Sequence, residues 1–430
     1  MDKDIVAVGG FVLLFVLMIL RVPVGIAMGL VGVGGFGLLT SWKAAFGLLA
    51  QSPFTTVTSF NLSIIPMFVL MGTFAASAGM SRDLFDAARA FLGHRRGGLA
   101  IATIAACGGF AAISGSAVAT AATMTRVALP ELRRAGYSPR LSTGVIAAGG
   151  TLGIMVPPSL MFVLYSLMTD VDLTKLFIAG LLPGVLGMLM YMATILTLGV
   201  EHMPRAERQG WGERLAALKG VWPALTLFIC VIGGIYGGIF TVTEAAGMGA
   251  VGALLIGAAQ GRLGASAIMD CLISALRTTA AIFMIVIGAY LFGYFLTITQ
   301  APQHIIEFLV ALPVGPYGVL ALVLGVYFIL GALMDELAMI LITVPIVFPA
   351  MTHLGFDPVW FGVIIVMTCV LGLICPPVGM NVFVVNSLAP EVKLGTIYRG
   401  VMPFILCDLI RLLLICLFPG IALLLPRLIG

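Results

Sequence analysis

The chain has 430 residues, of which 61% are hydrophobic and 9% are charged, and its formal net charge is +4. Soluble domains carry roughly 25% charged residues, so this composition excludes a sizeable aqueous domain and predicts an all-α polytopic membrane protein. The small excess of positive charge lies in short loops, where it indicates membrane topology and gives no sign of a nucleic-acid partner.

Apolar runs follow one another along the whole chain. The first of them lacks a basic leader and a small-residue cleavage site, so we interpret it as a retained span and not as a signal peptide. Several runs exceed the roughly 20 residues of one helical crossing, and we expect about ten to thirteen membrane-embedded segments. Residues 81–96 alternate charged and apolar residues at helical spacing, which predicts a surface helix, and the polar segment 201–219 divides the chain into halves. The runs cover residues 5–39, 61–80, 98–129, 140–168, 174–200, 221–259, 267–299, 316–350, 358–388 and 397–426.

Two diproline segments interrupt these runs, Pro157-Pro158 in "GGTLGIMVPPSL" and Pro376-Pro377 in "VLGLICPPVGMN". Adjacent prolines remove two backbone donors and break a helix, and at membrane depth such a break is tolerated only where it lines a protein cavity or binds something. Free carbonyl oxygens suit a hard cation such as sodium, and positive helix ends suit an anion. A plain proline kink is the structural alternative. The pairing of the breaks favours ion and substrate sites.

The two breaks belong to an internal repeat with a constant offset, which carries Leu152-Gly153 onto Leu371-Gly372. The same repeat offset carries "PELRRAGYSP" (130–139) onto "PAMTHLGFDP" (349–358). The halves would run over about residues 61–200 and 280–425. Basic residues surround the first connector, and the matching places of the second half hold no Lys or Arg. Because basic loops stay in the cytoplasm, we predict that the halves cross the membrane in opposite senses, as an inverted-topology repeat.

A second irregular stretch precedes each break. Small residues fill 108–124, and two half-length helices meeting at Ser114-Gly115-Ser116 would form a re-entrant hairpin, although ordinary small-residue helix packing is an equal alternative. The same reasoning places a second hairpin tip near Met334-Asp335-Glu336, where adjacent acids in an apolar run indicate function. Asp408 and Arg411, three residues apart in the last long run, are expected to form a structural pair.

These motifs together resemble the large membrane subunit of tripartite ATP-independent periplasmic (TRAP) transporters. The resemblance rests on "ISGSAVATAATM", "AAGGTLGIMVPPS", "IFTVTEAAG", "MDELAMILITVPIVFPAM" and "GLICPPVGMN", and it covers about residues 65–399. It implies an elevator-type transporter of the bacterial inner membrane, without a cofactor. It also implies as partners a small four-helix membrane subunit, a periplasmic substrate-binding protein, sodium ions and an organic acid anion such as a dicarboxylate, a sugar acid such as sialic acid, or a sulfonate.

The resemblance also implies a division of the chain. Residues 1–92 would hold scaffold helices and the surface amphipathic helix, 93–200 the first transport-domain repeat, and 201–310 a loop with further scaffold helices. Residues 311–395 would form the second transport-domain repeat and 396–430 a C-terminal scaffold helix. In each repeat a hairpin is followed by a broken helix.

Site residues follow from the resemblance position by position. One sodium site would lie where the first hairpin tip meets the first break, and a second at the positions related by the repeat offset. The anion would lie between the hairpin tips. In the second sodium site the resemblance leads us to expect a threonine where this chain has Cys375. A thiol is a poor sodium ligand, so either the backbone carbonyl of Cys375 coordinates the ion or the site is weakened. The sodium candidates are Ala112, Ser114, Gly153, Val156 and Ser159, then Gly331, Gly372, Cys375 and Val378, and the substrate candidates are Ser116, Asn381 and Asp335.

Other classes of function fit less well. A stand-alone sodium and anion symporter of related fold would use the same residues without a binding protein. An intramembrane serine hydrolase would need a base within reach of its serine, and the histidines at 94, 202, 304 and 353 lie near predicted loops or helix ends. The seven cysteines form no Cys-x-x-Cys pair, so neither a disulfide framework nor a zinc site is expected. We therefore predict a transporter and not an enzyme.

Overall fold

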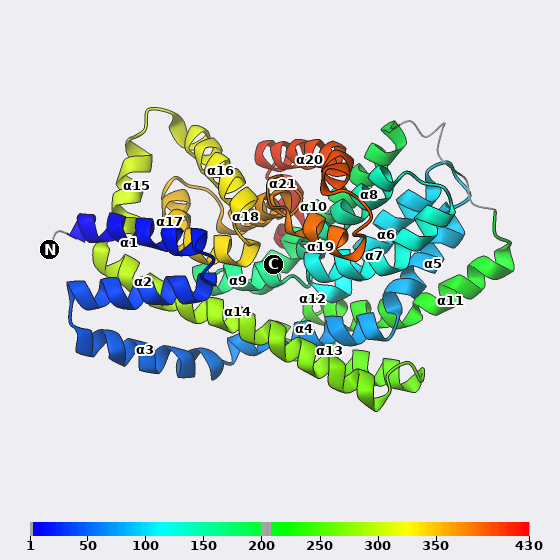
Figure 1. Ribbon diagram of the computed structural model, residues 1–430, viewed down its shortest axis with the longest axis horizontal. Helices are drawn as coiled ribbons and strands as arrows, with labels where there is room; N and C mark the ends of the chain where they lie inside the picture. Colours follow the sequence, from blue (N-terminus) through cyan, green and yellow to red (C-terminus); the bar gives the residue numbers. More distant parts are fainter. Residues whose placement is uncertain (1–2, 199–203, 205–207, 430) are drawn as a thin grey trace.

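The computed structural model describes residues 3–198, 204 and 208–429, and within these ranges the chain is helical without β-strands. Figure 1 shows the helices in chain order. They are α1 (Lys3–Ile19), α2 (Val24–Leu39), α3 (Trp42–Val57), η1 (Asn61–Ser63), α4 (Ile64–Ser77), α5 (Met80–Leu92), α6 (Gly98–Ser114), α7 (Ala117–Arg134), α8 (Pro139–Met155), α9 (Leu160–Thr169), α10 (Leu173–Thr197), α11 (Trp211–Phe228), η3 (Ile229–Gly233), α12 (Gly234–Tyr236), α13 (Val242–Ala259), α14 (Ala265–Thr299), α15 (Ala301–Ala311), α16 (Gly315–Leu333), α17 (Glu336–His353), α18 (Pro358–Gly372), α19 (Met380–Leu388), α20 (Leu394–Leu417) and α21 (Gly420–Ile429).

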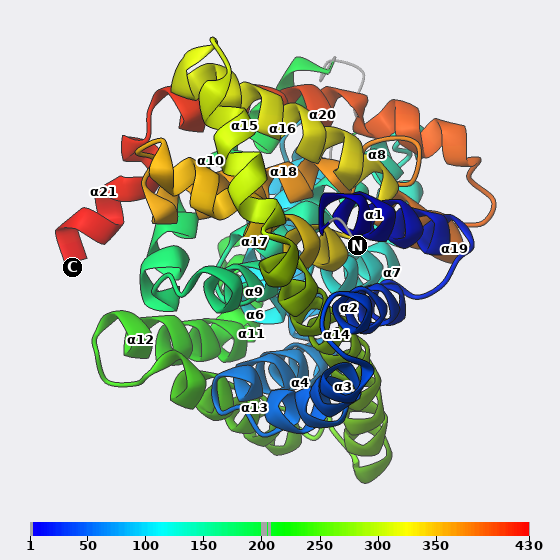
Figure 2. The ribbon, with the colours of Figure 1, turned by 90° about the vertical axis from the view of Figure 1, so that its left-hand side faces the viewer.

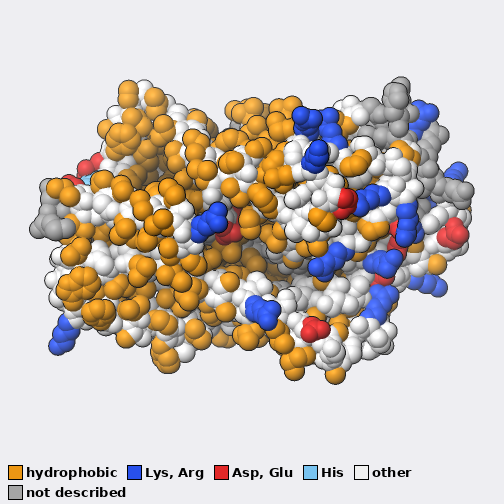
Figure 3. Space-filling view, in the orientation of Figure 1, with side chains coloured by type: hydrophobic (Ala, Val, Ile, Leu, Met, Phe, Trp, Pro, Cys, Tyr) orange, Lys and Arg blue, Asp and Glu red, His pale blue; other side chains and the backbone are white. Residues whose placement is uncertain are grey.

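The fold is that of a multi-pass membrane protein. Among the described residues, 8 helices are long and apolar enough to cross a membrane, or up to 9 if the bent pair of α3 and the η1–α4 segment is one span. Shorter apolar helices, including α6 and α18, lie beside them. Figure 3 shows hydrophobic side chains over most of one face, with Lys and Arg gathered at the end that holds α5, α7 and α11. We call this the basic end of the molecule.

Helix boundaries recur at the offset seen in the sequence. The helix α7 spans 117–134 and α17 spans 336–353, which is the same segment moved along the chain by the repeat offset. The helices before them end at Ser114 and Leu333, which the same offset relates, and both diproline bonds, Pro157-Pro158 and Pro376-Pro377, are cis. Each repeat therefore contains two helices separated by a short break, then a helix that stops before the prolines, then a short helix after them.

The two repeats interlock. The short helix α9 packs against α17 and α18 of the second repeat, and α19 packs against α7 and α8 of the first. The Tyr165 hydroxyl on α9 donates to the carbonyl of Pro358 at the start of α18 (2.7 Å). Arg133, at the end of α7, forms an ion pair with Glu391, just after α19. The turn between α7 and α8 thus lies beside the end of α19, and the turn between α17 and α18 lies beside α9. Oppositely directed repeats would require this arrangement, and the direction of the repeats across the membrane stays a prediction.

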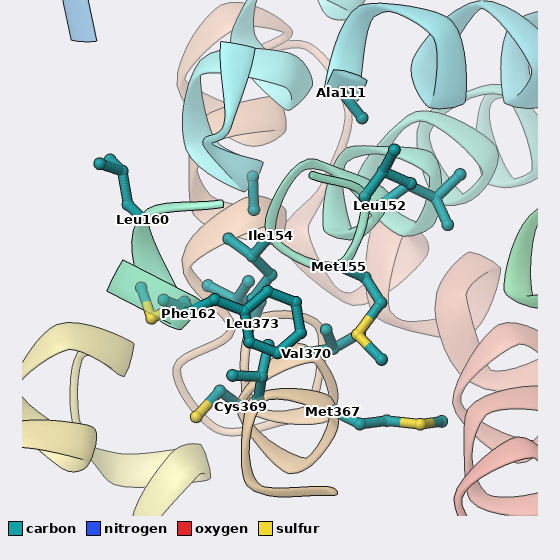
Figure 4. Close-up of a cluster of buried hydrophobic side chains, with 14 of the residues drawn as sticks. Ala111, Leu152, Ile154, Met155, Leu160, Phe162, Met367, Cys369, Val370 and Leu373 are labelled. Atoms are coloured by element: carbon teal, nitrogen blue, oxygen red, sulfur yellow. The ribbon is translucent and has the colours of Figure 1, made fainter. Parts of the chain in front are cut away.

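A shared hydrophobic core joins the repeats at the breaks. Figure 4 shows Ile154, Met155 and Phe162 from the first repeat beside Val370 and Leu373 from the second. All five side chains are buried. Burial of large apolar side chains stabilises this junction by roughly 1.5–3 kcal/mol for each of them. The two interrupted segments are therefore held in one rigid core.

Several helices flank this core. Figure 1 shows α1, α2, α3 and α14 running alongside one another. Figure 2 shows α4 and α13 on one side of the molecule and α16 and α20 on the other. The surface helix expected at 81–96 is α5, which packs against α6 and α11. The segment assigned to a C-terminal scaffold helix forms α20 and α21, and α20 packs one face along α8 and α10 of the first repeat while its other face is exposed.

Candidate functional site

The first hairpin tip is built by a glycine and a serine. The helix α6 ends at Ser114 because Gly115 adopts a left-handed conformation (φ 60°), which favours glycine. Ser116 then caps α7 by accepting a hydrogen bond from the Ala119 N–H (3.3 Å). The hydroxyls of Ser114 and Thr120 are 2.8 Å apart. The tip predicted at 114–116 therefore lies between two helix ends.

This tip meets the first helix break. The backbone N–H of Leu160 donates to the Gly115 carbonyl (3.4 Å), which joins the start of α9 to the tip. A side chain at Gly153 would collide with the Ser116 carbonyl. The Ser159 hydroxyl donates to the carbonyl of Ile154 across the break.

The structure thus gathers most of the first set of sodium candidates around one break. Ser114, Gly153 and Ser159 belong to this cluster. Val156, extended and outside the helix, begins the break itself. Ala112 lies on α6, two residues before the tip.

The second hairpin tip carries two carboxylates with different environments. Asp335 caps α17, since its Oδ1 accepts hydrogen bonds from the N–H groups of Leu337 (3.0 Å) and Ala338 (3.5 Å). Glu336 is 9% exposed, and its Oε2 is buried without a hydrogen-bond partner. The sequence favoured Asp335 as the functional acid, but the structure leaves Glu336 as the carboxylate with free coordination capacity. The preference of Asp for N-cap positions is the signal that could have separated them.

A small cavity lies where this tip meets the second break. Gly331 on α16 and Gly372 at the end of α18 touch so closely that a Cβ on Gly372 would lie 2.5 Å from the Gly331 carbonyl oxygen. Beside them is a cavity of about 10 Å³, the room of one water-sized particle. Among the predicted sodium ligands, Gly331, Gly372 and Val378 line it, together with Glu336. Cys375 does not line it, although its carbonyl lies close to Gly379, which does.

The lining of this cavity suits a hard monovalent cation. Unwound backbone supplies carbonyl oxygens, Glu336 supplies a buried carboxylate oxygen, and the space matches one small ion. Across the described ranges, no three His, Cys, Asp or Glu side chains gather as a transition-metal site would require. The residues present therefore fit sodium.

A larger cavity of about 570 Å³ opens between the two hairpin tips and the helices α4 and α14. Its size matches that of small-molecule sites. Both tips contribute to its wall, Ser116 from the first and Asp335 from the second. Asn381, predicted to bind substrate, is not part of this wall. Because α19 crosses onto the first repeat, the Asn381 side chain is buried there, and its amide nitrogen donates to the Ala147 carbonyl (3.1 Å).

The larger cavity leads from the tips toward the basic end. Its wall includes Ser77 at the end of α4 and Asp270 near the start of α14. These two helix ends are tied together by Arg262, which donates to the Ala78 carbonyl (3.0 Å) and to Asp83 on α5. Since α5 belongs to the basic end, the cavity runs from the tips toward that end.

Other buried polar groups are structural. Asp408 and Arg411 are fully buried 2.7 Å apart, an ion pair whose angle lies outside hydrogen-bond geometry. The Tyr191 hydroxyl donates to Asp408 (2.5 Å) and lies 3.0 Å from the Thr151 hydroxyl. The predicted pairing of the two charges is confirmed.

The described wall of the cavity between the tips offers neither of the nitrogen bases, histidine or lysine, that commonly activate a serine. The described residues that form its wall include no histidine or lysine. None of the three described histidines lines this cavity: His304 pairs with Asp4, His353 ends α17 and His94 follows α5. Residue 202 lies outside the described residues.

Comparison with known proteins identifies relatives over nearly the whole chain. The family model described as the tripartite ATP-independent periplasmic transporter, DctM component, matches residues 11–421. The C4-dicarboxylate TRAP transporter large permease protein DctM of Pseudomonas aeruginosa is 38% identical over 385 residues, which are 89% of this chain and 90% of that protein. The sialic acid TRAP transporter large permease protein SiaM of Vibrio cholerae is 31% identical over 411 residues, covering 94% and 95%.

One solved structure has a similar fold. It is the crystal structure of the Alcanivorax borkumensis YdaH transporter, with a TM-score of 0.60 and 17% sequence identity. The match covers 91% of this chain and 98% of that chain.

Proposed function

The chain belongs to the DctM family of tripartite ATP-independent periplasmic transporters, and from that premise we propose that it carries a small organic acid anion into the cell together with sodium. Membership makes it a multi-pass inner-membrane transport protein and not an enzyme. The observation that carries the proposal is the cavity of about 570 Å³ between the tips of two repeat-related hairpins, with an ion-sized cavity next to the second tip.

Two features of the larger cavity suit an anion, its helix ends and its hydroxyl groups, and they act beside the carboxylates of Asp270, Asp335 and Glu336 in the same wall. The N-terminal ends of α7 and α17 both lie at the tips, and helix N-termini carry a partial positive charge. Hydroxyls of Ser114 and Ser116 line the same wall. Relatives are named for C4-dicarboxylates and for sialic acid. The proposed substrate is therefore a dicarboxylate, a sugar acid such as sialic acid, or a sulfonate.

Sodium would occupy the two breaks. At the second, Gly331, Gly372, Val378 and Glu336 surround the ion-sized cavity. At the first, the carbonyls around Gly153 and Val156 and the hydroxyls of the nearby serines form the corresponding site. A bound sodium ion supplies positive charge beside the anion, which favours joint binding of the two.

The packing supports an elevator movement. The repeats interlock through α9 and α19, whereas α4 and α14 pack against them from outside, on α6, α9 and α17, and form the far wall of the substrate cavity. We place α6–α10 and α16–α20 in the mobile unit, including α20 because it packs along α8 and α10. By the positive-inside rule the basic end is cytoplasmic, so the present cavity would face the cytoplasm.

Partners follow from the family and from the surface. Large apolar side chains on α1 and α3 are exposed, for example Ile5 (67%) and Phe54 (71%), over the hydrophobic region seen in Figure 3. This surface would face lipid and the small four-helix membrane subunit. A periplasmic substrate-binding protein would deliver the anion.

Reconstitution tests the proposal. The protein and its small subunit would be placed in liposomes with an inward sodium gradient, and uptake of succinate, N-acetylneuraminate and isethionate would be measured with and without the periplasmic protein. Uptake that needs both sodium and the periplasmic protein is expected. Uptake without the periplasmic protein would support the stand-alone symporter instead, and uptake that ignores sodium would overturn the coupling.

A further inference from the structure

Glu336 is the one acidic side chain that lines both cavities of the described structure. It is nine-tenths buried, its Oε2 has no hydrogen-bond partner, and it belongs to the wall of the ion-sized cavity and to that of the larger one. The neighbouring Asp335 is already engaged as the cap of α17. A buried carboxylate without a partner is costly at membrane depth unless something neutralises it, which points to a missing positive ligand.

The position of Glu336 is not shared by the first repeat. Under the repeat offset, Glu336 corresponds to Ala117, and Asp335 corresponds to Ser116. The helices on either side of the two tips have matching boundaries, since α7 begins at Ala117 and α17 at Glu336. The repeat alone would therefore give two sites without carboxylates, and the acid is an addition to the second.

We propose that the Glu336 carboxylate is a direct ligand of the cation at the second site, alongside the carbonyls around Gly331, Gly372 and Val378. The inference rests on the proposed sodium coupling and assigns a charged ligand within it. The acid groups that face this region are Asp335 on the same tip and Asp270 across the larger cavity, and no Lys or Arg lines either cavity in the described residues. The described walls of the two cavities therefore supply no fixed positive side chain to balance Glu336, which leaves room for a bound cation in that role.

This ligand would link the cation to the anion. Without the cation, a negative group faces the cavity in which the anion binds, and like charges at this range repel. When the cation is bound, the same group is neutralised and the repulsion disappears. By reciprocity, the anion then also strengthens cation binding. The second site would therefore have to fill before the anion binds tightly.

Sodium binding to the purified protein tests the assignment. Thermal unfolding would be followed by intrinsic fluorescence while sodium chloride replaces choline chloride at constant ionic strength. Glu336→Gln keeps the shape of the side chain and removes its charge, and the half-saturating sodium concentration should rise by about tenfold or more. Glu244→Gln is the matched control. It removes one carboxylate that caps α13 by accepting from the Thr241 N–H (2.8 Å), away from both cavities, and should leave the sodium response unchanged.

A second measurement uses the unmodified protein. A hydrophobic carbodiimide should label Glu336, and sodium, but not choline, should protect it, as detected by mass spectrometry of the α17 peptide. Equal sodium affinity in the wild type and Glu336→Gln, or labelling that sodium does not change while it still stabilises the protein, would overturn the inference alone. A wild-type protein that shows no sodium response at all would instead overturn both the inference and the sodium coupling.

Discussion

Gly372→Ala is expected to abolish sodium-coupled uptake while leaving the protein folded and inserted. The new Cβ would lie 2.5 Å from the Gly331 carbonyl oxygen, and ordinary contact begins at 3.4 Å, so α16 and α18 must separate by about 0.9 Å. Overpacking of this kind costs about 1–3 kcal/mol, which a protein of this size can absorb. Both glycines line the cavity of about 10 Å³, and a displacement near 1 Å of its walls removes most of a ligand site's function, on the order of 100-fold.

The assay for Gly372→Ala needs a control on α16, the helix against which Gly372 packs. Gly325→Ala on α16 is suitable because nothing lies within 4 Å of its added Cβ. An alanine in a helix interior is favoured over glycine by roughly 0.8–1 kcal/mol, so this variant should fold and transport normally. Uptake would be measured in proteoliposomes over a range of sodium concentrations, and folding by thermal unfolding and by size-exclusion profile. A folded Gly372→Ala protein with the wild-type sodium dependence would refute the placement of the second site.

Three further substitutions test the first helix break, the cap of α17 and the buried structural ion pair. Gly153→Ala should also reduce sodium-dependent uptake, since its methyl group would collide with the Ser116 carbonyl, and sodium titration of uptake measures the effect. Asp335→Ala removes the cap of α17 and should lower the thermal stability by about 1 kcal/mol; a larger loss would mean that Asp335 has a role beyond capping. Asp408→Ala leaves Arg411 buried without its counter-charge and should destabilise the protein by about 3–5 kcal/mol, whereas replacing both residues with apolar ones should recover most of that loss in unfolding measurements.

The sequence predicted the elements whose cause is local. Helix ends depend on nearby residues, such as paired prolines, a left-handed glycine or a capping side chain, so the tips at 114–116 and near 335 and the breaks at the two diproline segments appear where the pattern indicates. A single proline is a weaker signal, since Pro130 and Pro345 stand inside α7 and α17. The repeat offset recurs in the helix starts for the same reason, because both copies hold a capping residue before the second hairpin helix, Ser116 or Asp335, and a proline at the start of the next helix, Pro139 or Pro358.

Contacts between the two repeats could not be predicted from the local sequence pattern, because they join segments that are far apart in the chain. The family resemblance led us to expect Asn381 near the substrate. The crossing of α19 onto α7 and α8 buries it against Ala147 instead. Glu336 was passed over because two adjacent acids look equivalent in sequence, and only the hydrogen bonds of Asp335 to Leu337 and Ala338 separate them.

The crossing of the short helices bears directly on how the protein would move. Because α9 packs on α17 and α18, and α19 packs on α7 and α8, neither hairpin can shift without carrying the other repeat's short helix with it. The buried core around Ile154 and Leu373 ties the two breaks together as well, and close-packed interiors transmit displacement more readily than they absorb it. Both sodium sites and the anion between them would therefore travel as one body past α4 and α14. Independent movement of the hairpins would require this core to open, and that cost favours an elevator over a pair of separate gates.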